Sequence, residues 1–239
     1  MSDIHYEKDF HHRVWEGDAL KWMLAMVERH NPEDLVILGD TGEQGWDEEE
    51  WETLIEKVRL HIIYGNHDNV EMLKNLRNVD RSRVWAKDGE VREIQGLRFG
   101  FINGIIFYNK KRKPLVPRKL PEEYLDYARI LAAKQVDVLC THASLPMPSE
   151  FSKFAPTEEF ATIGETIALV KPRIALSGHL SGPYMIGQIG GTGDAGLFET
   201  RFVRIDSSPQ EKHYLLLKGD GSDKILIYHD GKQVKEIKY

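Results

Sequence analysis

The chain has 239 residues, of which 41% are hydrophobic and 29% charged, enough to bury the core of one substantial α/β domain. Its 32 basic and 38 acidic residues give a formal net charge of −6, which argues against wholesale binding of nucleic acid or membranes. No apolar run approaches the roughly 18 residues that cross a bilayer, no signal peptide is visible, and the single cysteine excludes an internal disulfide. We therefore expect a cytoplasmic protein with one domain over residues 1–239.

Five apolar patterns organise the first third of the chain. Spacings of three and four residues predict helices over residues 17–30, 51–58 and 70–76. Unbroken apolar runs at residues 35–38 and 60–64 predict strands, and the first has the composition of a strand buried on both faces. Strands and helices therefore alternate from the start.

The remaining two thirds continue as mixed α and β structure. A hairpin is expected over residues 90–94 and 97–102, helices over 122–133 and 157–170, and short strands at 136–139 and 174–176. The tail predicts strands at 202–205, 214–217, 225–228 and 234–237, with Asp-Gly turns before the last two. These patterns predict an α/β sandwich in which mixed central sheets are flanked by helices.

Four of the expected strands end in side chains that can bind a metal ion. Asp40 follows the first strand and Asn66-His67 the second, while His142 and His179 follow the strands at 136–139 and 174–176. Because ligands gather beyond the carboxyl ends of strands in such sheets, we expect these side chains to converge.

A further carboxylate and imidazole stand near the chain start, in Asp3-Ile4-His5, on one side of an extended segment. A mixed set of carboxylate, imidazole and amide groups suits a transition-metal ion better than calcium, which prefers oxygen ligands alone.

In order and spacing, these residues resemble the signature of the calcineurin-like metallophosphoesterase family. The matching segments are Asp3-Ile4-His5, Gly39-Asp40, Gly65-Asn66-His67-Asp68, His142 and Gly178-His179. The resemblance runs from residue 3 to about residue 181, roughly three quarters of the chain, and Gly65–Asp68 is its most specific part. It implies a four-layer-type sandwich of two mixed β-sheets flanked by helices, with the strands of residues 182–239 completing the second sheet.

The resemblance also implies a site for two divalent transition-metal ions of the manganese, iron, zinc or nickel class. Asp40 would bridge both ions, with Asp3 and His5 on one and Asn66, His142 and His179 on the other. His67 would protonate the leaving oxygen, and Asp68 would orient its ring. The implied reaction is hydrolysis of a phosphate mono- or diester by in-line attack of a metal-bound hydroxide.

Three positions depart from the family pattern. Ser181 stands where a second imidazole completes Gly-His-x-His, so the ion at Asp3, His5 and Asp40 is expected to bind more weakly. Only Met1 and Ser2 precede Asp3, where the family has a central apolar strand; either the coding start lies upstream, or that strand is absent and its ligands are poorly anchored. Glu43 replaces an aspartate common in relatives, and we expect little effect.

Other patterns allow competing interpretations. Asp9-Phe10-His11 is a second Asp-x-His and an alternative ligand pair. Cys140 and His142 have the types of a thiol nucleophile and its base, although a buried structural cysteine is the simpler interpretation.

The glycine-rich segment at 191–196 fits a dinucleotide-binding pattern but precedes an expected strand rather than a helix, so a mobile or tight loop near the site is preferred. The basic stretch that includes Lys110–Lys113, Arg118 and Lys119 is a solvated loop or an attractor for an anionic substrate.

Two functions from different classes remain. The first is a metal-dependent phosphoesterase acting on a phosphorylated small molecule or nucleotide, with nucleic acid involved only as substrate and no membrane partner. The second is a catalytically weak or inactive scaffold that keeps the fold around a degenerate metal site, suggested by Ser181. Retention of His67 and Asp68, neither of them an expected ligand, favours the enzyme.

Overall fold

The computed structural model describes residues 1–6, 19–43, 46–107, 118–145, 158–193, 196–208, 210–218 and 223–239. The helices are α1 (Ala19–His30), α2 (Glu48–Ile55), α3 (Val70–Asn75), α4 (Pro121–Ala132) and α5 (Glu158–Val170). The strands are β1 (Asp34–Ile37), β2 (Arg59–Ile62), β3 (Val91–Ile94), β4 (Leu97–Ile102), β5 (Ile105–Ile106), β6 (Arg118–Lys119), β7 (Val138–Thr141), β8 (Ile174–Ser177), β9 (Met185–Gly193), β10 (Gly196–Arg204), β11 (His213–Lys218), β12 (Lys224–His229) and β13 (Lys232–Lys238). Within these ranges, no helix combines the length and apolarity needed to span a membrane.

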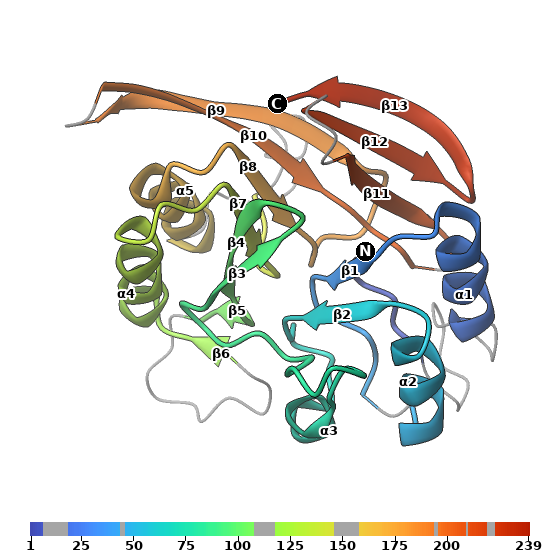
Figure 1. Cartoon of the computed structure of the whole chain (residues 1–239). Helices are drawn as coiled ribbons and strands as arrows, with labels where there is room; N and C mark the ends of the chain where they lie inside the picture. The colour runs from blue at the N-terminus through green and yellow to red at the C-terminus, as the bar shows by residue number, and fades with distance from the viewer. Residues whose placement is uncertain are drawn as a thin grey trace.

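The largest sheet has six strands in the order β3-β4-β7-β8-β10-β9. Its centre is parallel, from β4 through β7 and β8 to β10, while β3 and β9 are antiparallel edge strands. In Figure 1, α4 and α5 lie side by side along this sheet, whereas α1, α2 and α3 surround the separate parallel pair β1-β2. Mixed sheets with flanking helices confirm the predicted fold class.

The C-terminal strands divide between two sheets. The β9-β10 hairpin joins the six-stranded sheet, but β11, β12 and β13 pair as an antiparallel sheet of their own within the described residues. The strands after residue 182 therefore belong to two different sheets rather than to one. They pack against the larger sheet through buried side chains such as Ile225 and Ile227 rather than through backbone hydrogen bonds.

The sequence patterns missed strand β9. Its glycines provide no apolar alternation and have low strand propensity, yet its backbone pairs along its whole length with β10. The loop expected at 191–196 is consequently wrong for the described residues there, because 191–193 end β9 and 196 begins β10. The long β9-β10 hairpin is visible at the top of Figure 1.

Residues 1–6 run beside the end of β1 and the loop that follows it. The Met1 amine donates to the Val36 carbonyl at 3.0 Å, and the Leu38 amide donates to the Met1 carbonyl at 2.9 Å. Further on, the amides of Asp3 and His5 donate to the carbonyls of residues 39 and 40 at 3.0 and 2.9 Å. The poor anchoring expected for Asp3 and His5 is therefore not found, because backbone hydrogen bonds hold this segment in place.

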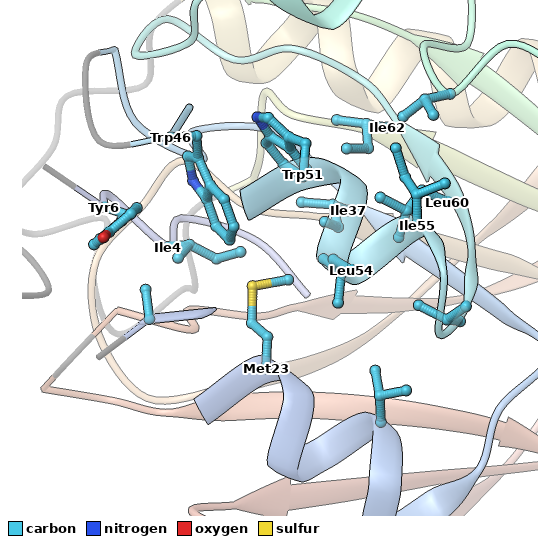
Figure 2. Packing of buried hydrophobic residues seen from close by; sticks show 14 of the residues in the cluster. Ile4, Tyr6, Met23, Ile37, Trp46, Trp51, Leu54, Ile55, Leu60 and Ile62 are labelled. Atoms are coloured by element: carbon cyan, nitrogen blue, oxygen red, sulfur yellow. The ribbon is translucent and has the colours of Figure 1, made fainter. Parts of the chain in front are cut away.

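A buried apolar cluster holds β1 and β2 against α1 and α2. Figure 2 shows Trp51 and Leu54 of α2 packed with Ile37, Leu60 and neighbouring side chains between the helix and the strand pair. Each fully buried side chain of this size contributes roughly 1.5–3 kcal/mol of transfer free energy. This packing positions the loops that leave the carboxyl ends of β1 and β2.

Candidate metal centre

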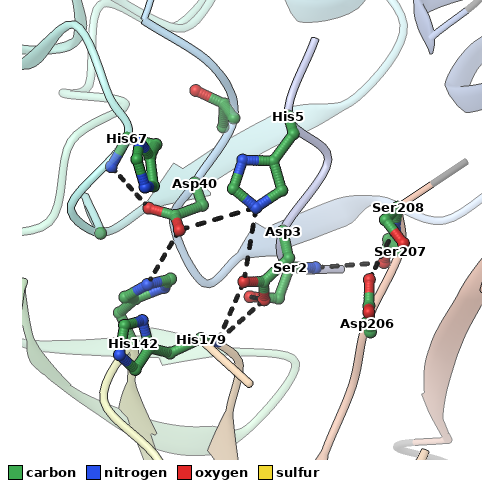
Figure 3. A network of polar contacts seen from close by, with 12 residues as sticks. Ser2, Asp3, His5, Asp40, His67, His142, His179, Asp206, Ser207 and Ser208 are labelled. Atoms are coloured by element: carbon green, nitrogen blue, oxygen red, sulfur yellow. Dashed lines mark hydrogen bonds and ion pairs between the residues drawn. The ribbon is translucent and has the colours of Figure 1, made fainter. Parts of the chain in front are cut away.

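Polar side chains from two different sheets meet at the carboxyl ends of parallel strands. Asp40 and Asn66 lie on the loops after β1 and β2, and His142 and His179 lie on the loops after β7 and β8. Figure 3 shows Asp40, His142 and His179 gathered with Asp3 and His5 of the N-terminal segment. The parallel pairing of both strand pairs places their loops at one edge, as the sequence predicted.

Two groups of three side chains are close enough to hold metal ions. The ligand atoms of Asp3, His5 and Asp40 lie within 4.8 Å of one another, and so do those of Asp40, His142 and His179. Asp40 belongs to both groups. This sharing is compatible with the bridging of two ions by Asp40, which stays a prediction.

Two candidate ligand atoms, Asn66 Oδ1 and one ring nitrogen of His142, have no hydrogen-bond partner among the described residues. Asn66 Oδ1 is buried and has no hydrogen-bond partner among the described residues. His142 Nδ1 lies 2.7 Å from the Leu38 carbonyl oxygen, which can only accept, so Nδ1 carries a proton. In the neutral ring this leaves the lone pair of His142 Nε2, also buried and without a hydrogen-bond partner, beside Asp40 Oδ2 at 3.3 Å. The donor set fits a divalent transition-metal ion.

Four of the candidate ligand residues have a left-handed backbone, with φ of 56° at Asp3, 49° at His5, 53° at Asp40 and 70° at His179. This conformation is uncommon for residues other than glycine and costs on the order of 1–3 kcal/mol at each position. Such residues concentrate at functional sites because the surrounding structure must enforce them. Their concentration here supports a functional role for these four residues.

Glycines allow the loops to approach the ligands closely. A Cβ atom at Gly65 would overlap the Asp40 carboxylate and the His142 ring, and one at Gly178 would overlap Ser2 and Asp3. These two of the three glycines in the predicted signature are thus required by the space around the carboxylates.

The electrostatics of the centre favour a bound cation. Burial raises the pKa of the Asp3 carboxyl to about 7, with a further contribution from the charge of Asp40. Burial lowers the pKa of an imidazole, but the adjacent Asp40 carboxylate outweighs this effect and raises the pKa of His142 to about 10. Burial likewise opposes the charge on Asp40, yet His142 holds the pKa of Asp40 well below its usual range. Cations bound at the centre would therefore compete with the proton on His142.

The ring of His67 contacts a different carboxylate from the one expected. His67 Nδ1 lies 3.1 Å from Glu43 Oε1, and both side chains are about half exposed. The ring also stands edge-on to His5, with 5.5 Å between centroids. Glu43, judged unimportant from the sequence, is thus the residue in contact with the proposed proton donor.

Asp68 binds backbone amide groups and not the ring of His67. Its carboxylate accepts hydrogen bonds from the backbone amides of Asp40, Thr41 and Gly65 at 2.6–2.8 Å, and from the Thr41 hydroxyl. Asp68 is buried and points away from solvent, toward the β1 loop. The expectation that Asp68 orients His67 is wrong in this structure, because its oxygens already cross-link the two ligand-bearing loops.

A carboxylate that the sequence patterns missed stands beside His179. Glu159 Oε1 of α5 lies 4.0 Å from His179 Nε2. Burial raises the pKa of Glu159 to about 7, and burial together with His142 lowers the pKa of His179 to about 3. No sequence pattern could reveal this contact, since Glu159 lies on the helix that precedes β8 and belongs to no motif.

Ser181 is exposed on the loop that follows His179. The next residue, Gly182, donates its amide to Asp206 Oδ2 at 3.0 Å, which fastens this loop to the segment after β10. Asp206 also accepts from the Ser208 amide at 2.8 Å. Among the described carboxylates, imidazoles and thiols, the first candidate group consists of Asp3, His5 and Asp40.

The structure describes some of the residues on which the competing interpretations depend. Cys140 is fully buried, and burial raises the pKa of its thiol, which supports a structural cysteine. Lys119, included in the basic stretch, is not a steering residue: it is buried, lies 3.2 Å from Asp88 and donates to the Asn103 carbonyl at 2.6 Å. The pair Asp9 and His11 and the segment Lys110–Lys113 lie outside the described residues.

A cavity of about 210 Å³ lies elsewhere, between β1, β4 and β11. Apolar side chains such as Leu35, Leu97 and Leu215 form most of its lining, and none of the proposed ligands lines it. The cavity therefore lacks the groups that the proposed chemistry needs.

The mixed sheets with flanking helices, the two candidate ligand groups and the carboxylate that they share define a metal-binding α/β protein. The sequence model of the calcineurin-like phosphoesterases matches residues 1–182, and the chain belongs to this family. A solved dimetal phosphatase from Danio rerio aligns with all of this chain and 97% of its own, at 13% identity and a TM-score of 0.56. Another solved chain aligns over the same proportions at 11% identity and a TM-score of 0.57. No curated protein matches the sequence significantly.

Proposed function

We propose that this chain is a two-metal phosphoesterase that hydrolyses a phosphate mono- or diester of a small molecule or nucleotide. The observation that carries the proposal is the sharing of Asp40 between the two ligand groups. One carboxylate common to both groups favours a paired centre over two independent sites. Membership in the calcineurin-like phosphoesterase family supports the same reaction class.

When bound, two divalent cations would supply Lewis-acid activation of water and of the phosphoryl group. Asp40 would hold both ions, Asp3 and His5 one of them, and the second group the other, with Asn66 contributing its unpaired Oδ1. The imidazole and amide ligands favour ions of the manganese, iron, zinc or nickel class.

His67 is proposed as the general acid. Its side chain is 49% exposed and stands beside His5 at the rim of the centre, where a substrate can reach it. The contact with Glu43 favours a proton on Nδ1 when the ring is neutral, and on both nitrogens when it is charged. A ring held in this way can donate a proton to the leaving oxygen.

Hydrolysis of p-nitrophenyl phosphate and bis-p-nitrophenyl phosphate tests the proposal. Each ester is incubated with EDTA-treated protein to which Mn²⁺, Zn²⁺, Ni²⁺ or Fe²⁺ is returned separately. We expect turnover of at least one ester that requires metal and is lost in Asp40→Asn. His229→Ala, which changes a histidine on β12, is the control and should retain the wild-type rate.

The scaffold interpretation has one observation in its favour, the exposed Ser181 at the position of a family ligand. It predicts ion binding at the second group without turnover of either ester. Turnover that appears only in Ser181→His would show a degenerate site. Metal-dependent turnover by the wild type would exclude an inactive scaffold.

A further inference from the structure

Glu159 is a partly buried acid that the reaction described above does not use. Its side chain is 20% exposed, and its Oε1 atom is buried without a hydrogen-bond partner among the described residues. A carboxylate oxygen in this situation costs free energy unless a nearby group compensates for it. Among the described residues, the imidazole of His179 lies within ion-pairing distance of this oxygen.

The contact between the two side chains is electrostatic. Glu159 Oε1 lies 4.0 Å from His179 Nε2, beyond hydrogen-bonding distance but close enough for the carboxylate to attract a proton on that nitrogen. The His179 side chain is 22% exposed, so solvent screens the attraction only partly.

His179 needs such a neighbour if it is to bind an ion. A neutral imidazole carries a proton on one nitrogen and a free lone pair on the other. A neighbouring acceptor or negative charge decides which nitrogen keeps the proton. His142, in the same ligand group, shows this arrangement: Leu38 accepts from Nδ1, and Nε2 faces Asp40. For His179, the backbone is held by the Asp3 carboxylate, but this contact does not select a ring tautomer.

We propose that Glu159 is a positioning residue that keeps the proton of His179 on Nε2 and so leaves Nδ1 free for the ion shared with Asp40 and His142. The inference rests on the metal site proposed above and adds a residue to it. His142 and His179 would then present opposite ring nitrogens to the ion, the first selected by its hydrogen bond to Leu38 and the second by the charge of Glu159.

The position of Glu159 on α5 suits a second, structural role. It lies in the first turn of α5, where a carboxylate stabilises a helix through the partial positive charge of the amide groups. That role predicts a loss of helix stability on substitution but no effect on His179. The two roles can therefore be separated by observing the imidazole directly.

The test uses the variants Glu159→Gln, Glu159→Ala and Glu159→Asp, with Glu165→Gln as control. Glu165 is exposed on the same helix. Long-range ¹H–¹⁵N spectra of EDTA-treated protein at pH 8 report the tautomer of His179. Titration with Mn²⁺, followed by the electron paramagnetic resonance of free Mn²⁺, reports ion affinity without reference to turnover.

In the wild type and Glu165→Gln, we expect the Nε2–H tautomer of His179. Glu159→Ala should give a mixture of tautomers and weaken Mn²⁺ binding at one site about 10–100-fold, whereas Glu159→Asp should retain part of the affinity. If Glu159→Ala does not fold, the isosteric Glu159→Gln provides the same comparison. An unchanged tautomer and unchanged affinity in these variants would overturn the proposal.

Failure of the phosphoesterase proposal would look different. Protein that binds Mn²⁺ in a Glu159-dependent manner but cleaves neither ester would refute the enzymatic function and leave the positioning role intact. Ester cleavage and Mn²⁺ affinity that are both unchanged in the Glu159 variants would refute the positioning role and leave the enzymatic function intact.

Discussion

The backbone amide of His179 donates to both carboxylate oxygens of Asp3, at 3.0 and 2.9 Å. The first and the last of the proposed ligands along the chain are thereby joined directly. Asp68 joins the loops of Asp40 and Gly65 in the same way, with its carboxylate accepting from backbone amides. Buried carboxylates thus hold the loops of the centre together as well as providing its ligands.

Asp40→Asn should remove high-affinity binding at both ion positions, because Asp40 belongs to both ligand groups. The substitution also removes the negative charge that would attract the two cations. Metal content after dialysis, measured by mass spectrometry, checks this expectation. Loss of only one ion in the variant would contradict the bridging role of Asp40.

His67→Ala should lower kcat on the order of a hundredfold or more with metal content unchanged, because His67 is a proposed proton donor and not a ligand. Glu43→Gln should lower kcat by a smaller factor, since it removes the charge beside His67 Nδ1 but leaves the ring in place. Steady-state kinetics and metal analysis of the same samples test both variants. A His67→Ala enzyme with wild-type kcat would exclude the general-acid role.

Asp68→Asn should destabilise the fold by roughly 1–3 kcal/mol, because the amide NH₂ group would face backbone donors that now meet a carboxylate. For a chain of this length, each kcal/mol corresponds to a fall in Tm of about 2–4 °C. Calorimetry measures the change, with Glu43→Gln as a matched acid whose Tm should stay close to that of the wild type. A variant that keeps its Tm but loses kcat would instead restore Asp68 as a partner of His67.

Ser181→His should strengthen binding of the ion held by Asp3, His5 and Asp40, because it supplies an imidazole where relatives carry one. The exposed position of Ser181 leaves space for the larger side chain. Titration with Mn²⁺ should show a tighter second binding step, with the first step unchanged. Equal affinities in variant and wild type would mean that position 181 does not reach this ion.

The ion-free protein should lose stability between pH 8 and 9.5. Folding raises the pKa of His142 from its ordinary 6.5 to about 10, so the stability contributed by its proton is fully present below pH 6.5 and disappears as the pH rises through 10. The thiol of Cys140 contributes with the same sign, since burial raises its pKa. Melting curves in EDTA should therefore show Tm falling with pH.

The Asp40→Asn variant is the control for this pH dependence. It removes the carboxylate that raises the pKa of His142, so its Tm should fall less steeply than that of the wild type. Equal slopes for the two proteins would assign the pH dependence to other groups. Added Mn²⁺ should stabilise the wild type more at pH 8.5 than at pH 7, because the ion displaces the proton from His142.

The sequence by itself predicted which strand ends carry the candidate ligands. Apolar runs ending in polar residues predicted the strand ends that carry Asp40, Asn66, His142 and His179, because a change from apolar to polar residues is a local property of the chain. The spacing of the signature extended this prediction to Asp3 and His5. The residues next to each of these positions in the sequence were enough to predict it.

Only the tertiary structure decided which carboxylate serves which histidine. Glu43 contacts His67, Asp68 binds the backbone of the β1 loop, and Glu159 stands beside His179, although sequence proximity favoured Asp68 as the partner of His67. Strand β9 likewise formed against β10 without an apolar pattern of its own. Such contacts depend on how separate loops and strands pack together. The pattern of residues within one segment carries no information about which side chain of a distant segment will contact it.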